Sequence, residues 1–124
     1  MKRIAMIGAG ISGMTCASRL QTAGIEVVVF DKSRGPGGRI TTRRRESGRF
    51  DHGAQYFTVE SADFQRTVDV WAAAGVVEEW RGRFAEWKDG AFISKESVGK
   101  RWVAQPRMSA LSRHLAEGLT LHLQ

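Results

Sequence analysis

Apolar residues recur with strand and helix periods along the chain, and their spacing predicts the first three elements. The run Ile4–Ile7 predicts a strand over about residues 3–7, and a helical pattern follows over about residues 11–23, where Gly24 ends it. A second apolar run predicts a strand over about residues 26–31. This order is typical of a βαβ unit with a parallel sheet.

The pattern then changes to shorter and mostly extended segments. Residues 32–39 are too rich in glycine for a regular element. Ser61 is typical of a helix N-cap, and Phe64, Val68 and Trp71 are spaced to share one face of the helix that follows. The remaining predicted elements are an extended segment at 41–45, helices at 62–74 and 108–117, and strands at 76–80, 84–88, 91–94, 102–103 and 119–123, with a hairpin turn at Asp89-Gly90.

A glycine motif stands between the first predicted strand and the first helix. Gly8 permits a tight turn, Gly10 lets the backbone approach a pyrophosphate, and Gly13 lets the helix pack close to the sheet. Asp31 lies eighteen positions after Gly13, where a carboxylate can accept hydrogen bonds from a ribose 2′-hydroxyl. The pattern predicts a dinucleotide-binding site. A secretory signal peptide and a glycine turn that binds nothing are the alternatives.

Length and composition restrict the location and the partners. The 124 residues suit one small domain, and no stretch approaches the roughly 18 apolar residues of a membrane span. The single cysteine, Cys16, excludes an internal disulfide, fits a reducing cytoplasm and is expected to be a small packed residue. His52, His114 and His122 have no metal-ligand spacing, so no metal site is predicted.

The net charge of +6 is concentrated directly after the glycine motif. A basic cluster in this place suits the phosphates of a bound cofactor or substrate, and no stacking aromatic residues are interleaved as a polynucleotide site would require. We therefore predict small-molecule partners and no nucleic acid. The cluster consists of Arg34, Arg39, Arg43, Arg44, Arg45 and Arg49.

A second motif separates flavin from nicotinamide cofactors. Gly37–Arg39 places a close-approach backbone and a guanidinium beside the cofactor's phosphates, where Arg forms bidentate charge-assisted hydrogen bonds. Gly53 and Ala54 then supply small residues against which a flat ring can lie, followed by the Gln55 amide and the Tyr56 ring.

With these motifs the chain resembles the flavin-dependent amine oxidase superfamily, and within it the bacterial renalase-like oxidoreductases. The resemblance covers nearly all of the chain. It implies an α/β fold, in which a Rossmann-like FAD-binding βαβ unit is followed by the start of a β-rich substrate domain. The chain is then an incomplete domain, the N-terminal portion of a longer protein. The matching segments are Ile7–Gly13, Val29–Arg39, Phe50–Thr58, Arg101–Val103, Pro106 and Met108–Leu111.

The resemblance also implies a division of the chain and a set of cofactor contacts. Residues 1–75 are expected to form the FAD-binding segment, residues 76–105 a β-rich segment of the substrate domain, and residues 106–124 a helix and strand that return to the FAD domain. FAD is expected without covalent attachment, and the catalytic residues are expected beyond Gln124. The predicted cofactor-binding residues are Gly8, Gly10, Ile11, Ser12, Gly13, Asp31, Lys32, Gly38, Arg39, Gly53, Ala54, Gln55 and Tyr56.

The implied activity is oxidation of isomeric forms of reduced NAD(P), with oxygen as final acceptor and hydrogen peroxide as product. A generic flavin amine oxidase acting on a small amine and a nucleotide-binding fragment without activity are the alternatives. The chain departs from the family's pattern at Arg107 and Ala104, where glycine is common. It also has Glu60 after Val59, where a basic residue is common, so a positive charge beside the flavin pocket is missing.

Aromatic side chains are candidates for both core and site. The positions of Trp71, Trp80, Trp87 and Trp102 favour core or domain-interface residues over the lining of a substrate pocket. Tyr56 is the side chain that we most expect near substrate.

Overall fold

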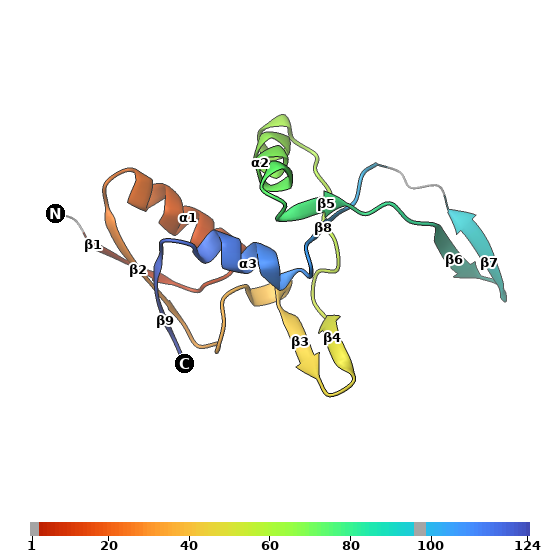
Figure 1. Ribbon diagram of the computed structural model, residues 1–124, viewed down its shortest axis with the longest axis horizontal. Helices are drawn as coiled ribbons and strands as arrows, with labels where there is room; N and C mark the ends of the chain where they lie inside the picture. Colours follow the sequence, from red (N-terminus) through yellow and green to blue (C-terminus); the bar gives the residue numbers. More distant parts are fainter. Residues whose placement is uncertain (1–2, 96–98) are drawn as a thin grey trace.

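The computed structural model describes residues 3–95 and 99–124. A parallel sheet with the strand order β1-β2-β9 lies at one end of the molecule, and helices α1 and α3 lie against it (Figure 1). The βαβ unit predicted from the first apolar runs is therefore confirmed. The unit consists of β1 (Arg3–Ile7), α1 (Ile11–Thr22) and β2 (Glu26–Asp31). Helix α3 (Ser109–Ala116) and strand β9 (Thr120–Leu123) join it from the end of the chain.

The register of the sheet brings three strand ends to one edge. Ile7 pairs with Phe30, and Asp31 pairs with Leu123, so the carboxyl ends of β1, β2 and β9 lie together. Strand β2 is the central strand, which explains why Val27–Val29 are buried in succession. Met14 and Ala17 of α1 pack onto this strand and are fully buried, forming a first core.

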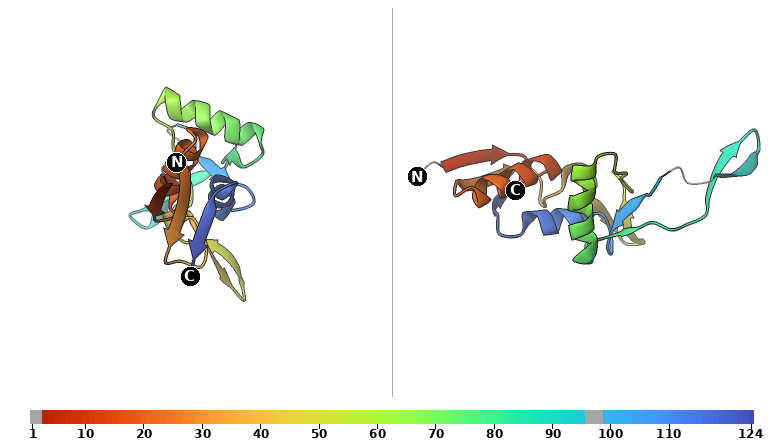
Figure 2. Two further views of the ribbon diagram at one scale, coloured as in Figure 1. Left: turned by 90° about the vertical axis from the view of Figure 1, so that its left-hand side faces the viewer. Right: turned by 90° about the horizontal axis from the view of Figure 1, so that it is seen from above.

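A second core lies under helix α2 and extends to the start of α3. Val68 and Trp71 of α2 pack with Trp102, Met108 and Leu111, each at most 8% exposed. The hairpin of β6 and β7 stands away from both cores (Figures 1 and 2). The other elements are a short 3₁₀ turn η1 (Gly38–Ile40), β3 (Thr42–Arg45), β4 (Gly48–Asp51), α2 (Ala62–Ala73), β5 (Val77–Glu79), β6 (Phe84–Lys88), β7 (Ala91–Lys95) and β8 (Trp102–Ala104), paired as β3-β4, β5-β8 and β6-β7.

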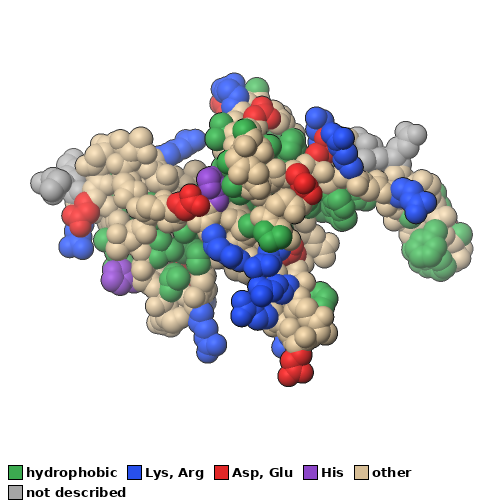
Figure 3. All heavy atoms as spheres, in the orientation of Figure 1, with side chains coloured by type: hydrophobic (Ala, Val, Ile, Leu, Met, Phe, Trp, Pro, Cys, Tyr) green, Lys and Arg blue, Asp and Glu red, His purple; other side chains and the backbone are tan. Residues whose placement is uncertain are grey.

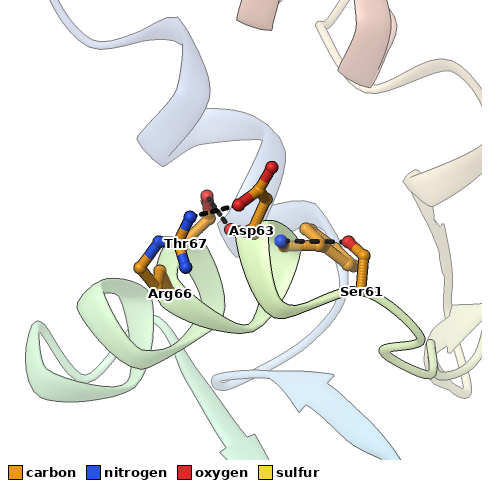
Figure 4. Close-up of polar contacts among 5 residues, drawn as sticks. Ser61, Asp63, Arg66 and Thr67 are labelled. Carbon is orange, nitrogen blue, oxygen red and sulfur yellow. Dashed lines mark hydrogen bonds and ion pairs between the residues drawn. The ribbon is translucent and has the colours of Figure 1, made fainter.

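Helix α2 begins as the sequence predicts. The Ser61 hydroxyl accepts a hydrogen bond from the Phe64 N–H at 3.2 Å, which satisfies one of the free donors at the helix start (Figure 4). Asp63 lies in the first turn, where its charge suits the helix dipole, and it pairs with Arg66. In the described part of the chain, no helix combines the length and the apolar character that crossing a membrane requires.

Three expectations differ from the structure. Strand β4 is not predicted, because Gly48–Asp51 has no apolar alternation and forms a strand only by pairing with β3. Trp80 and Trp87 are 42% and 61% exposed, so the core alternative is wrong for them and the domain-interface alternative stays a prediction, whereas Trp71 and Trp102 are buried. Cys16 is exposed rather than packed, because the buried face of α1 runs through Met14 and Ala17.

Gly13 offers a test of the contact between α1 and the turn before it. A Cβ at Gly13 would lie 2.1 Å from the Gly8 carbonyl oxygen, whereas a Cβ at Gly10 meets no atom within 4 Å of it among the described residues. We expect Gly13→Ala to lower the free energy of unfolding by about 1–3 kcal/mol through overpacking, despite the better helix propensity of alanine.

The matched control is Gly10→Ala, whose backbone φ of −77° suits alanine and which should leave stability near the wild-type value. Urea denaturation of the three proteins measures the difference. Equal stabilities would show that the helix does not require a glycine at this contact.

Candidate functional site

A hollow of about 620 Å³ lies at the sheet edge where the carboxyl ends of β1, β2 and β9 meet. This edge is where open α/β sheets bind their ligands. The hollow is lined by Ile7, Gly8, Phe30, Asp31, Lys32, Ser33, Gly38, His122, Leu123 and Gln124.

The turn from β1 into α1 brings backbone groups to this edge. Gly8 adopts a φ of 104°, which suits glycine, and its N–H donates to the Phe30 carbonyl at 2.7 Å. Helix α1, which is described throughout its length, has neither a side-chain cap nor an acidic residue in its first turn. Its N-terminal N–H groups and the positive end of its dipole are therefore suited to an anionic group such as a phosphate.

Asp31 ties the end of β2 to the glycine turn. Its Oδ2 accepts a hydrogen bond from the Ala9 N–H at 2.6 Å, and its Oδ1 accepts one from the Ser33 N–H at 2.7 Å. The Ala9 N–H, followed by the Ser33 hydroxyl and the Ser33 N–H, holds the pKa of the Asp31 carboxyl below its ordinary value. A carboxylate has about four acceptor sites, so Asp31 can still accept from a ribose hydroxyl in the hollow.

A second glycine pair lies directly against this turn. The Gly37 N–H donates to the Ala9 carbonyl at 2.7 Å, and Gly37 forms an isolated parallel bridge with Gly10. A Cβ at Gly38 would lie 3.4 Å from the Gly10 Cα, so the two backbones are close enough to bind one extended ligand. Both Gly37 and Gly38 have positive φ values, 132° and 54°, which glycine adopts readily.

The segment after β4 packs against the backbone of Arg39, the residue that follows Gly38. A Cβ at Gly53 would lie 2.1 Å from the Arg39 carbonyl oxygen, and the Ala54 N–H donates to the same oxygen at 2.9 Å. The Gln55 side chain is exposed, and the Tyr56 side chain is 39% exposed. The three segments predicted to bind the cofactor therefore contact one another in series.

Four of the predicted residues line the hollow at the sheet edge, namely Gly8, Asp31, Lys32 and Gly38. The other six lining residues are not predicted, and two of them, Phe30 and His122, have stacked rings with centroids 5.1 Å apart. His122 reaches the site only because β9 pairs with β2, a contact that has no local sequence signal. The rule that parallel strands end at one edge of the sheet could have found it.

Ile11 and Ser12 line a different groove. Their side chains, together with Cys16, face a space of about 710 Å³ between α1 and α2, which Phe64 and Trp71 close on the other side. Residues 11 and 12 can therefore serve a ligand at the sheet edge through their backbone N–H groups, and their side chains do not share the hollow with Asp31.

Two further arginines, Arg107 and Arg113 from the α3 region, lie near arginines of the predicted basic cluster. Lys and Arg side chains gather beside β3 and the start of α3 (Figure 3). Arg49 lies opposite Arg44 in the β3-β4 ladder, and the charges of Arg107, Arg44 and Arg113 lower the pKa of Arg49. Asp51 forms no ion pair with these arginines among the described residues, and its carboxylate accepts from the Thr42 hydroxyl and from the Met108 N–H.

No group of three or more potential metal ligands occurs within residues 3–95 and 99–124. The candidate site is therefore built from backbone donors, one carboxylate and flanking cations.

Comparison with known sequences gives a family and a set of relatives. Residues 6–74, more than half of the chain, match the family described as NAD(P)-binding Rossmann-like domain. A 4,4′-diapophytoene desaturase (4,4′-diaponeurosporene-forming) of Staphylococcus aureus strain Newman is 39% identical over 51 residues, which are 41% of this chain and 10% of that protein. The same desaturase of strain USA300 aligns equally. The chain spans about a tenth of the length of these curated relatives.

Comparison with solved structures gives the same fold. A putrescine oxidase variant from a redesign of cofactor binding superposes with a TM-score of 0.56 at 22% identity, over 77% of this chain and 21% of that chain. Wild-type putrescine oxidase bound to putrescine gives a TM-score of 0.54 at 20% identity, over 77% and 22% of the two chains. The predicted α/β, Rossmann-like fold is thereby confirmed.

Acidification should remove the contribution of Asp31 to stability. Because the folded-state pKa of Asp31 lies below its ordinary value of 3.8, this contribution is present above pH 3.8 and is lost as the pH falls through the folded-state pKa. We expect Asp31→Asn to lower the free energy of unfolding near neutral pH, and the difference from wild type to shrink below pH 3.8.

Urea denaturation between about pH 7 and about pH 2 measures this difference. Ser33→Ala retains both backbone donors to Asp31 and removes the Ser33 hydroxyl, so its loss of stability in acid should be smaller than that of wild type but still present. A difference between Asp31→Asn and wild type that stays constant over the whole range would contradict the assignment.

Proposed function

The chain belongs to the NAD(P)-binding Rossmann-like domain family, and on this basis we propose that the protein carrying it is an FAD-dependent oxidoreductase. The observation that supports this proposal best is the serial contact of three glycine segments. The first dinucleotide turn contacts Gly37 and Gly38, and Arg39 in turn contacts Gly53 and Ala54.

The residues present fit the ADP half of the cofactor. Asp31 would accept hydrogen bonds from the adenosine ribose, because its carboxylate lines the hollow and retains acceptor capacity. The N-terminus of α1 and the backbone at Gly10 would hold the pyrophosphate, since a Cβ at Gly10 meets no described atom within 4 Å and the space there is open. The Arg39 guanidinium is exposed and would pair with the phosphates.

The arrangement beyond the pyrophosphate favours a flavin over a nicotinamide dinucleotide. The Gly53–Tyr56 segment is fixed to Arg39 by the Ala54 hydrogen bond, and it offers a backbone surface without large side chains at Gly53 and Ala54. A flat, three-ring system can lie against such a surface. The Asp31 carboxylate would also repel a 2′-phosphate, so the cradle suits an unphosphorylated adenosine ribose.

When bound, FAD supplies acceptance of a hydride from the substrate and transfer of the electrons to oxygen. The residues of this chain bind and orient the reactants. The backbone of Gly53 and Ala54 would support the ring system, and Tyr56, whose side chain is 39% exposed, would form one wall of the substrate space. Ionised Asp31 would fix the adenosine end.

For the substrate we propose isomeric forms of reduced NAD(P), as in the renalase-like oxidoreductases that the chain resembles, with oxygen as the final acceptor. The net charge of +6 supports a substrate that carries phosphate, because the pyrophosphate of the cofactor would neutralise only part of it. A small amine is the second candidate, supported by the fold that the chain shares with putrescine oxidase and by the Tyr56 and Trp80 rings, whose centroids lie 6.0 Å apart.

Cofactor binding tests the first part of the proposal. Calorimetric titration of FAD into the apoprotein should give saturable binding, and NAD⁺ and NADP⁺ should bind more weakly. Asp31→Ala should weaken FAD binding by about 1.5–3 kcal/mol, the range for a hydrogen bond to a charged group.

Gly10→Val should abolish FAD binding by blocking the approach of the pyrophosphate, while the open space at this position lets the variant fold. Circular dichroism provides the folding control. Full flavin occupancy in a folded Gly10→Val protein, or an unchanged dissociation constant for Asp31→Ala, would overturn the proposed cofactor site.

The choice of substrate is tested by anaerobic stopped-flow absorbance of the FAD-loaded protein. Mixing with an isomer of NADH reduced at the 2- or 6-position of the nicotinamide ring should bleach the flavin, and mixing with putrescine should leave it oxidised. Bleaching by putrescine and not by the NADH isomers would favour the amine oxidase alternative.

A further inference from the structure

Two segments that are distant from Arg101 in sequence, at Tyr56 and at residues 80–84, meet beside its guanidinium. Its Cζ lies 4.1 Å from the centroid of the Phe84 ring and 4.8 Å from the centroid of the Tyr56 ring. Trp80 contacts both rings, with centroid distances of 5.2 Å to Phe84 and 6.0 Å to Tyr56. Two aromatic rings therefore contact one half-buried cation, and the third ring, that of Trp80, packs against both of them.

Backbone hydrogen bonds fix this arrangement. The Arg101 carbonyl accepts from the Trp80 N–H at 2.7 Å, and the next residue, Trp102, exchanges two hydrogen bonds with Phe57 at 2.9 and 3.0 Å. Phe57 and Trp102 form a bridge, and Tyr56 and Arg101 each come directly before one of these two residues. Hydrogen bonds therefore fix the backbone of Arg101 on both sides.

The charge of Arg101 has no carboxylate partner in the described part of the chain. The nearby acid, Glu79, instead lies 3.6 Å from Arg81 and 3.7 Å from Lys100. Among the described residues the Arg101 guanidinium forms no hydrogen bond to a protein oxygen, so its N–H donors can serve a ligand.

A hollow of about 330 Å³ lies beside this cation. Among its lining side chains are three cations, Arg81, Lys100 and Arg101, and one acid, Glu79, which leaves an excess of two positive charges. A phosphate group carries about −1.5 to −2 charges at neutral pH, and a guanidinium binds it through two parallel hydrogen bonds. The charge of the hollow therefore suits a phosphate better than a singly charged carboxylate.

We propose that the hollow at Arg101 binds the phosphate of the oxidised substrate, with Tyr56 at the boundary between this phosphate site and the reacting ring. The inference rests on the proposed function and adds the residues that select a nucleotide-like substrate.

Phosphate binding can be tested without flavin. In ¹H–¹⁵N spectra of the chain, inorganic phosphate added at constant ionic strength should shift the Arg101 side-chain N–H and the Trp80 indole N–H in a saturable way. Arg101→Met keeps a long side chain on the rings and removes the charge, and it should weaken phosphate binding about tenfold or more. Arg101→Lys should restore part of it.

The matched control is Arg83→Met, at an exposed neighbouring position outside the hollow, which should leave the phosphate affinity unchanged. Phosphate shifts that persist in Arg101→Met would overturn the proposal. So would the absence of saturable shifts at Arg101 and Trp80 in the wild type, including the case in which phosphate moves only resonances of the β3-β4 arginines.

The FAD-loaded protein gives a second readout. Isomers of reduced nicotinamide mononucleotide and of the corresponding riboside differ only in the phosphate. Arg101→Met should raise KM about tenfold for the mononucleotide, leave KM for the riboside unchanged and leave kcat unchanged for both. An equal rise for both substrates would show that Arg101 has only a packing role.

The two proposals fail in different ways. A wild-type protein that binds no flavin contradicts the proposed function, and the phosphate titration then decides the Arg101 site alone. A flavin-loaded protein in which Arg101→Met is indistinguishable from wild type in both measurements contradicts only the Arg101 site.

Discussion

Close backbone contact at glycine is the constraint on which the rest of this structure depends. Helix α1 can approach the sheet only because Gly13 has no Cβ, which would lie 2.1 Å from the Gly8 carbonyl oxygen. The segment after β4 contacts Arg39 for the same reason, because a Cβ at Gly53 would lie 2.1 Å from the Arg39 carbonyl oxygen. Between these two contacts, Gly37 donates directly to the Ala9 carbonyl. Side chains at these places would separate the three segments, and the continuous backbone surface that suits a long dinucleotide would be lost.

The elements that sequence predicts well are those with a local physical signal. Ser61 caps α2 through its own hydroxyl, and Asp89-Gly90 turns the β6-β7 hairpin with positive φ at both residues. Strand β4 and the position of His122 have no such signal, because both depend on pairing with a strand elsewhere in the chain. The sequence indicates Arg101 only as part of a family segment, since its aromatic neighbours come from two other segments, at Tyr56 and at residues 80–84.

The acidic residues explain why the excess of positive charge remains available. Asp31 and Asp51 are both used for backbone N–H groups, of Ala9 and Ser33 in the first case and of Met108 in the second. A carboxylate used in this way stabilises a loop or a helix start, and in the described part of the chain neither Asp31 nor Asp51 forms an ion pair with an arginine. Arg49 and Arg44 therefore face each other across the β3-β4 ladder without an acid between them, an arrangement that costs stability.

The two hollows also differ in the kind of group that each can hold. The sheet-edge hollow combines backbone donors with one carboxylate, a set suited to a ribose and a pyrophosphate at once. The hollow at Arg101 has aromatic walls and an uncompensated guanidinium, a set suited to a phosphate that must be released after each turnover. Tyr56 lies two residues after Ala54, and its ring contacts the Arg101 guanidinium. A substrate whose phosphate binds at Arg101 would therefore place its ring beside a cofactor whose adenosine end binds at Asp31. The same backbone segment would then align both reactants, which is the main contribution that a protein makes to hydride transfer between two bound rings.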